Sequence, residues 1–185
     1  MSRLTVFADD HPRDALLRSE SFEEIAAELR RVGVRFERWS GTSAAGGGVR
    51  PGDPPEAVIA AYRGDIDRLI AAEGYQSVDV VSLDSDHPQK AALRQKFLAE
   101  HTHAEDEVRF FVAGQGLFSL HLGGRVYEVL CTQGDLIGVP AGTSHWFDMG
   151  PNPRFVAIRL FNNPEGWVAR YTGSAIAERF SRLEH

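Results

Sequence analysis

The stretch at 101–161 restricts the possible folds of this chain more than any other part of the sequence. It consists of short runs of alternating apolar and polar residues that are broken by glycines. Such runs are typical of the strands of an antiparallel barrel or sandwich. Between two of them, Gly123-Gly124 has the composition of a two-residue hairpin turn. We therefore expect an antiparallel β-barrel core at about 101–161.

The rest of the chain predicts mainly helices around this core. A capping box at 21–24 begins a helix with apolar residues at helical spacing, and Gly33 ends it. Asp53-Pro54-Pro55 begins a second helix, and Gly74 follows its end. The sequence further predicts helices at 88–97 and, closing the chain, at about 174–182, with strands at 34–39 and 78–83.

We expect one domain over 1–185, of the α+β class and mainly β, in which a helical N-terminal part at about 1–97 packs on the barrel core. The length of 185 residues and the hydrophobic content of 43% fit one folded core and exclude a disordered chain. The glycine-rich stretch at 41–52 has no periodic pattern, and no Lys-Ser/Thr pair follows its glycines. A surface loop explains this stretch better than a phosphate-binding loop does.

The net charge, the apolar runs and the cysteine content limit the partners and the location that we expect for this chain. With 20 Lys+Arg against 26 Asp+Glu, the net charge of −6 argues against a nucleic-acid or anionic-membrane partner. The sequence has no long apolar run and no apolar signal-peptide core, so we expect no membrane span and a cytoplasmic location. The single cysteine, Cys131, excludes an intrachain disulfide and is interpreted as a small core residue.

One segment concentrates side chains that carry chemistry. If 101–111 is extended throughout, alternation places on one face His101, His103, Glu107, Arg109 and Phe111. The other face then carries Val108, Phe110 and Val112, which can pack outward against the helices. Two imidazoles and a carboxylate suit a divalent first-row metal, although a solvated acidic loop with two exposed histidines would have the same sequence.

A second segment supplies a third imidazole. The run at 134–145 reads as a strand, a Pro/Gly turn and a histidine, and in a closed barrel this could bring His145 beside the first three groups. Both segments resemble the motifs of the cupin superfamily. The first motif is matched by His101, His103, Glu107 and Gly114, and the second by Gly134, Pro140, Gly142 and His145. Gln95 and Met149 depart from the usual Gly and Asn, but neither is a ligand position.

Within this superfamily the sequence is similar to the acireductone dioxygenases over about 22–180. The similarity is carried by the residues around both motifs and by later runs such as Arg159-Leu160-Phe161 and Asn163-Pro164-Glu165-Gly166-Trp167. The resemblance implies a double-stranded β-helix, or jelly-roll, barrel. It also implies one Fe2+ or Ni2+ ion per chain with four ligands, namely His101, His103, Glu107 and His145.

The resemblance further implies an enzyme of methionine salvage that oxidises acireductone with O2. With Fe2+ the expected products are 4-methylthio-2-oxobutanoate and formate, and with Ni2+ they are 3-methylthiopropanoate, formate and CO. Arg109 is expected to stabilise a developing oxyanion, unless it only pairs with Glu107 or Asp106. An apolar wall for the methylthio tail is expected from Phe97, Phe111 and Phe147, each of which could equally be a core residue.

The sequence leaves two other classes of function open. The same four ligands serve other metal-dependent cupin enzymes, such as oxalate-degrading or sugar-isomerising ones, and a non-enzymatic cupin could also bind a metal or a small ligand. Arg109 and the aromatic residues suit an enediol with an apolar tail better than oxalate or a sugar phosphate. We expect a monomer whose partners are a small-molecule substrate and O2, and we expect His121 to be structural.

Overall fold

The computed structural model describes residues 1–40, 49–50 and 52–184, so the loop predicted at 41–52 lies mostly outside the described residues. The described strands are β1 (Arg3–Ala8), β2 (Ala15–Ser19), β3 (Arg35–Arg38), β4 (Ser77–Leu83), β5 (His101–Thr102), β6 (Glu107–Leu122), β7 (Arg125–Thr132), β8 (Asp135–Val139), β9 (Ser144–Asp148), β10 (Phe155–Phe161) and β11 (Arg170–Tyr171). The described helices are α1 (Phe22–Arg31), α2 (Pro55–Ala61), α3 (Arg63–Glu73) and α4 (Lys90–Leu98), with 3-10 turns η1 (Pro164–Trp167) and η2 (Ile176–Arg179).

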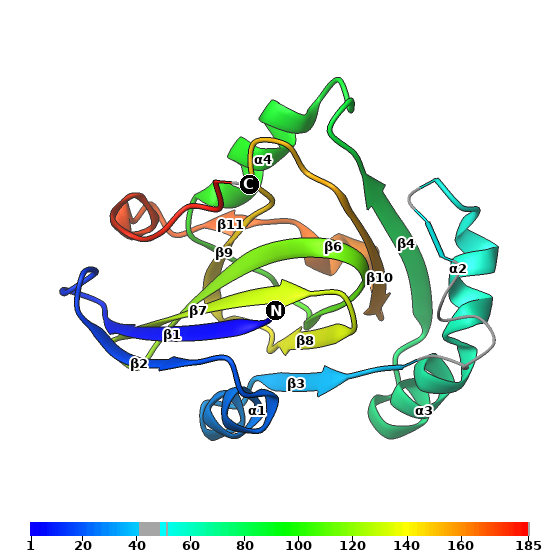
Figure 1. Ribbon diagram of the computed structural model, residues 1–185, viewed down its shortest axis with the longest axis horizontal. Coiled ribbons are helices and arrows are strands. Elements are labelled where there is room, and N and C mark those ends of the chain that lie inside the picture. The colour runs from blue at the N-terminus through cyan, green and yellow to red at the C-terminus, as the bar shows by residue number, and fades with distance from the viewer. Residues whose placement is uncertain (41–48, 51, 185) are drawn as a thin grey trace.

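The long strand β6 organises the barrel, because its two halves pair with different neighbours. Its first half lies between β8 and β10, and its second half lies between β7 and β9. All of these pairings are antiparallel, and the predicted turn at Gly123-Gly124 joins β6 to β7. Figure 1 shows β6 crossing the middle of the molecule, with α2 and α3 outside β4 and with α1 below β3. The predicted class, a mainly antiparallel cupin barrel with flanking helices, is confirmed.

Side-chain alternation along the first half of β6 separates two apolar regions. Val108, Phe110 and Val112 pack in one cluster with Tyr62 and Ile66 of the helical segment at 55–73. This arrangement confirms that these three residues face outward against helices. A second cluster fills the barrel interior with residues that include Leu4, Phe111, Phe118, Phe147 and Cys131. Cys131 is fully buried there, as predicted for a core residue.

The prediction that residues 1–97 are mainly helical was wrong at the N-terminus. Strands β1 and β2 form a hairpin there, and β1 continues the sheet by pairing with β7 from Arg3↔Leu130 to Ala8↔Arg125. The reason is tertiary, because the edge of β7 supplies hydrogen-bond partners that a local pattern of six residues does not reveal. The barrel therefore uses strands from outside 101–161.

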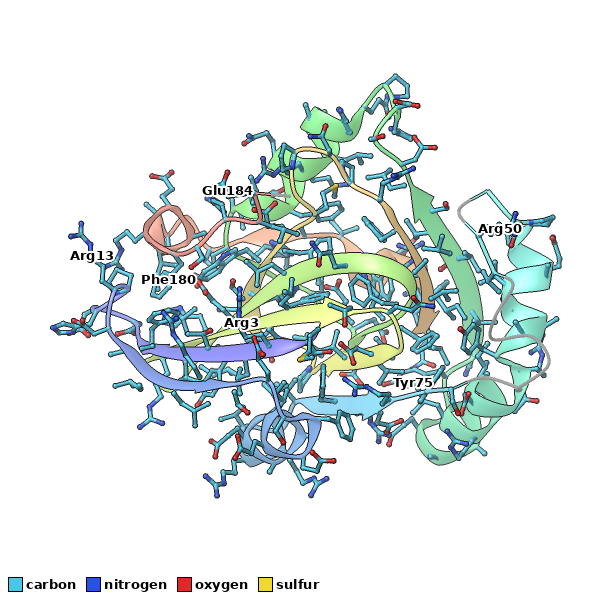
Figure 2. The ribbon with its side chains drawn as sticks, in the orientation of Figure 1. Arg3, Arg13, Arg50, Tyr75, Phe180 and Glu184 are labelled. Carbon is cyan, nitrogen blue, oxygen red and sulfur yellow. The ribbon has the colours of Figure 1, made fainter. Side chains whose placement is uncertain are left out.

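Two predicted helices also differ in extent. The second helix is divided into α2 and α3 at Tyr62, whose φ of −118° is not helical. Its buried ring packs on the ring of Phe110, with the two centroids 4.8 Å apart, and this packing interrupts the helix. The closing helix at 174–182 is only the turn η2, because Phe180 packs against Phe7 and Trp146. Figure 2 labels Phe180 beside this turn. After this turn the chain follows the sheet, and the Ser181 amide donates to Glu128.

Among the described residues, no helix is both long enough and apolar enough to cross a membrane.

Gly114 is the last residue of β6 that pairs with β10, and a substitution there tests how closely the two backbones approach. Gly114 has a φ of +77°, and a Cβ there would overlap the carbonyl oxygen of Arg154. We expect Gly114→Ala to lower the free energy of unfolding by about 3 kcal/mol or more, from the left-handed conformation plus the clash. Gly124→Ala is the matched control, because its φ is +74° but a Cβ there meets nothing within 4 Å. Urea unfolding of both variants measures the difference, and equal losses would contradict the clash.

Candidate metal centre

Three buried histidines converge at one end of the barrel. His101 lies in β5 and His145 lies in β9, and the two residues are paired in the ladder between these strands. His103 follows β5, and its ring centroid lies 4.8 Å from that of His101 and 5.1 Å from that of His145. One ring nitrogen from each histidine lies within 4.8 Å of the others. The structure thus brings together residues that are 44 positions apart in the sequence (145 − 101).

The chain between His103 and Glu107 bends, so the segment at 101–111 is not extended throughout, and the condition for one shared face is not met over its whole length. The Gly142 amide donates to the His103 carbonyl oxygen at 2.9 Å, and the Ala141 amide donates to Asp106 Oδ1 at 2.9 Å. Tyr75, which lies just after α3 (Figure 2), donates its hydroxyl to Asp106 Oδ2 at 3.0 Å. These bonds tie the bend to the Pro/Gly turn before β9. They hold His103 and His145 in one region despite the break in the strand.

Glu107 begins β6 and points into the same region. Its Oε2 lies 2.9 Å from His145 Nε2 and 3.1 Å from His103 Nε2, and the side chain is buried. Its Oε1 accepts a hydrogen bond from Arg109 Nη2 at 2.8 Å. Burial alone would raise the pKa of Glu107, but Arg109 and the two histidines outweigh burial and hold this pKa well below its usual range. The carboxylate is therefore negatively charged in the folded protein.

Each of the three histidines is oriented through its Nδ1 atom. The Nδ1 atoms of His101 and His145 lie 2.7 Å and 2.8 Å from the carbonyl oxygens of Ala99 and Thr143. His103 Nδ1 lies 3.4 Å from the carbonyl oxygen of Val168. A proton on Nδ1 leaves Nε2 as the lone-pair donor, which is how metal-binding histidines are usually held. Three such nitrogens beside a buried carboxylate fit a divalent first-row metal ion.

The burial of His101 predicts a pH dependence for the metal-free protein. Burial, together with the neighbouring His145, lowers the pKa of His101 from 6.5 to about 4. Between these values the unfolded chain binds a proton that the folded chain does not, so the free energy of unfolding rises with pH. The stability that the neutral imidazole contributes is complete above pH 6.5 and is lost as the pH falls toward 4.

We expect acidification of the metal-free protein from pH 7 to pH 4 to cost about 3 kcal/mol through His101. Urea unfolding at several pH values measures this cost, and His101→Gln should show a correspondingly shallower dependence. Parallel curves for the two proteins would contradict the lowered pKa.

Arg109 lies directly behind the candidate centre. Its guanidinium carbon lies 4.7 Å from the ring centroid of Phe147 and 5.5 Å from that of Phe118. Its Nε is buried and has no hydrogen-bond partner among the described residues. The pairing of Arg109 with Glu107 is thus present, and one donor of Arg109 remains for another group.

The three candidate aromatic residues lie in different surroundings. Phe111 and Phe147 are fully or almost fully buried in the interior cluster, and Phe97 of α4 is partly buried against it. Phe147 also contacts the Arg109 guanidinium. Phe111 packs on Phe118 and Phe155 in the core. The role of these rings toward a substrate stays a prediction.

The structure adds a second arginine that the sequence analysis did not place near the centre. Arg159 of β10 is the partner of Arg109 in the β10–β6 ladder, so the two side chains project from the same face. Asp79 of β4 binds the Arg159 guanidinium through both oxygens, at 2.8 Å and 2.5 Å. Trp167 covers this guanidinium at 4.5 Å, and together with Phe161 these residues line a cavity of about 90 Å³. The alternation along 155–161 could have predicted on which face of its strand Arg159 lies. The sequence did not reveal that this strand pairs with β6.

Comparison with known proteins places this centre in a family. The model of the ARD/ARD' family matches residues 3–169. The chain is 60% identical over 184 residues to an acireductone dioxygenase of Alcanivorax borkumensis, covering 98% of both chains. It is 55% identical to an acireductone dioxygenase of Yersinia enterocolitica over the full length of both.

A solved structure agrees with these sequence relatives. An acireductone dioxygenase of Bacillus anthracis with a cadmium ion in its active centre superposes with a TM-score of 0.77 at 29% identity. The superposition covers 92% of this chain and 98% of the other. The family model, the full-length relatives and this fold agree, and the chain belongs to the ARD/ARD' family.

Proposed function

We propose that the protein is an acireductone dioxygenase, which cleaves acireductone with O2. The observation that carries the proposal is the meeting of His101, His103 and His145 around the charged carboxylate of Glu107. The high identity to acireductone dioxygenases over the full length supports it. The predicted reactants, a small-molecule substrate and O2, follow from this function. A monomer and a cytoplasmic location stay predictions.

The residues that would hold the ion are these three histidines and Glu107, and the ion would be Fe2+ or Ni2+. When bound, the ion would supply Lewis-acid and redox chemistry to a chelating enediolate and O2. These four side chains would hold the ion and would leave part of its coordination shell for a substrate. One carboxylate leaves a divalent centre with a net charge of about +1, which an anionic substrate can offset.

Arg109 would act on the substrate rather than on the ion. Its guanidinium holds a fixed positive charge in a mostly buried position, and its Nε is free of partners among the residues that the structure describes. A charge-assisted hydrogen bond from this group would orient the enediolate and stabilise the charge that develops on oxygen. The ring of Phe147 beside it excludes water and offers an apolar contact.

The proposed products depend on the ion, and the reaction would belong to methionine salvage. We expect 4-methylthio-2-oxobutanoate and formate with Fe2+, and 3-methylthiopropanoate, formate and CO with Ni2+. The test is to remove all metal, reload separate samples with each ion, and measure O2 uptake and products with acireductone. CO from the Ni2+ sample alone is the expected distinction. No O2 uptake by either loaded sample would refute the proposal.

A further inference from the structure

The strand that carries His101 has a second polar cluster on its opposite side. Glu100 precedes His101, so their side chains project to opposite faces of β5 and its approach. Glu100 is only 4% exposed, which is unusual for a carboxylate that makes no ion pair with an Arg or Lys of the described residues. It bonds to His121 at the end of β6 and to Thr172 after β11, and His121 in turn bonds to Asp9 after β1. We call these four residues the Glu100 clamp.

The hydrogen bonds of the clamp hold both the side chain and the backbone of Glu100. Its Oε2 lies 2.7 Å from His121 Nδ1, and its Oε1 accepts from Thr172 Oγ1 at 2.7 Å. Its carbonyl oxygen accepts from the Thr172 amide at 3.1 Å. The end of β6 and the segment after β11 therefore converge on this one residue.

His121 joins two carboxylates, which strengthens the clamp. While Nδ1 faces Glu100, Nε2 lies 3.1 Å from Asp9 Oδ2. Both nitrogens are satisfied when both carry protons, so the two bonds are charge-assisted. Burial opposes the charged ring, but the bonds to Asp9 and Glu100 outweigh it and raise the pKa of His121. Such a bridge resists rotation of the Glu100 side chain more than one neutral hydrogen bond would.

The clamp reaches the metal centre through the backbone. His101 Nδ1 bonds to the carbonyl oxygen of Ala99 at 2.7 Å, and Glu100 is the residue between them. Any rotation of the peptide units flanking Glu100 would move this carbonyl oxygen or the Cα atom of His101. We propose that Glu100, held by His121 and Thr172, is a positioning residue that sets the orientation of the His101 imidazole toward the metal. The inference rests on the proposed role of His101 as a ligand.

The test measures the geometry and affinity of the centre with Co2+ as the probe. Metal-free wild type and Glu100→Ala are titrated with Co2+, and the visible absorption bands report the arrangement of the ligands. We expect Glu100→Ala to bind Co2+ about 10- to 100-fold more weakly, the usual loss for a partner that orients a ligand, and with shifted bands. Glu100→Gln, which keeps one acceptor oxygen, should recover part of the affinity.

A matched control separates positioning from stability. Asp135 is also a fully buried carboxylate, and it accepts from Arg38 and the Thr132 amide. Asp135→Ala should lower the Tm but leave the Co2+ affinity and spectrum unchanged. If Glu100→Ala lowers only the Tm in the same way, the positioning role is refuted.

A second variant and the titration of the wild type cover two further outcomes. If Glu100→Ala does not fold, Thr172→Val removes one side-chain bond from outside the strand, and it should weaken Co2+ binding by a smaller factor with a similar band shift. An unchanged Thr172→Val spectrum would then overturn the inference. Failure of wild type to bind Co2+ would instead refute the metal centre itself, and with it the proposed function.

Discussion

Replacing His145 by alanine is expected to leave the protein unable to retain its metal ion. The residue is 2% exposed, and its Nε2 lies 2.9 Å from Glu107 Oε2. Removing one of three converging imidazoles deletes a ligand. The loss of metal affinity should exceed the roughly 10- to 100-fold loss that follows when a hydrogen-bond partner of a ligand is removed. We expect metal content near zero after dialysis and no detectable dioxygenase rate. Metal analysis and O2 uptake measure the two results.

The control for this variant is a histidine away from the centre. His11 is exposed and contacts Asp10 at the surface. His11→Ala should keep one ion per chain and the full rate. If His145→Ala also binds one ion with the affinity of wild type, His145 is not a ligand, and the centre must be rebuilt from other groups.

Replacing Arg109 by alanine is expected to lower kcat by about 10²- to 10³-fold while the metal remains bound. The guanidinium is mostly buried and lies 2.8 Å from Glu107, and its Nε has no partner among the described residues. A donor held in a buried site contributes most where charge develops during the reaction, because it needs no reorganisation. The expected result is therefore a loss in rate rather than in metal content. Steady-state kinetics and metal analysis on one preparation measure both.

Two other outcomes would assign Arg109 differently. Full rate with metal retained would leave Arg109 as a structural partner of Glu107 alone. Loss of metal together with rate would mean that Arg109 acts by holding Glu107 in place. Arg31→Ala is a suitable control, because Arg31 makes an exposed pair with Glu28 and should change neither quantity.

The sequence predicted the parts of the fold that depend on local pattern. The alternation along β6 correctly predicted that Phe110 faces outward against the helices, and the Gly123-Gly124 turn lies where it was expected. The strands β1 and β2 were missed, because their stability comes from pairing with β7 rather than from their own composition. The bend after His103 was missed for a similar reason, since its hydrogen bonds come from the turn at 140–142.

The sequence by itself determined which side chains the centre has to offer. Three imidazoles, a carboxylate and a guanidinium stand at motif positions, and their chemistry restricts the class of ion and substrate. Only the tertiary structure decided which of them meet and what lies behind them. The pairing of His101 with His145, of Arg109 with Arg159, and the clamp on Glu100 all join strands that are distant in the chain. Such contacts depend on strand register and on the closure of the barrel, and no local pattern of residues encodes these.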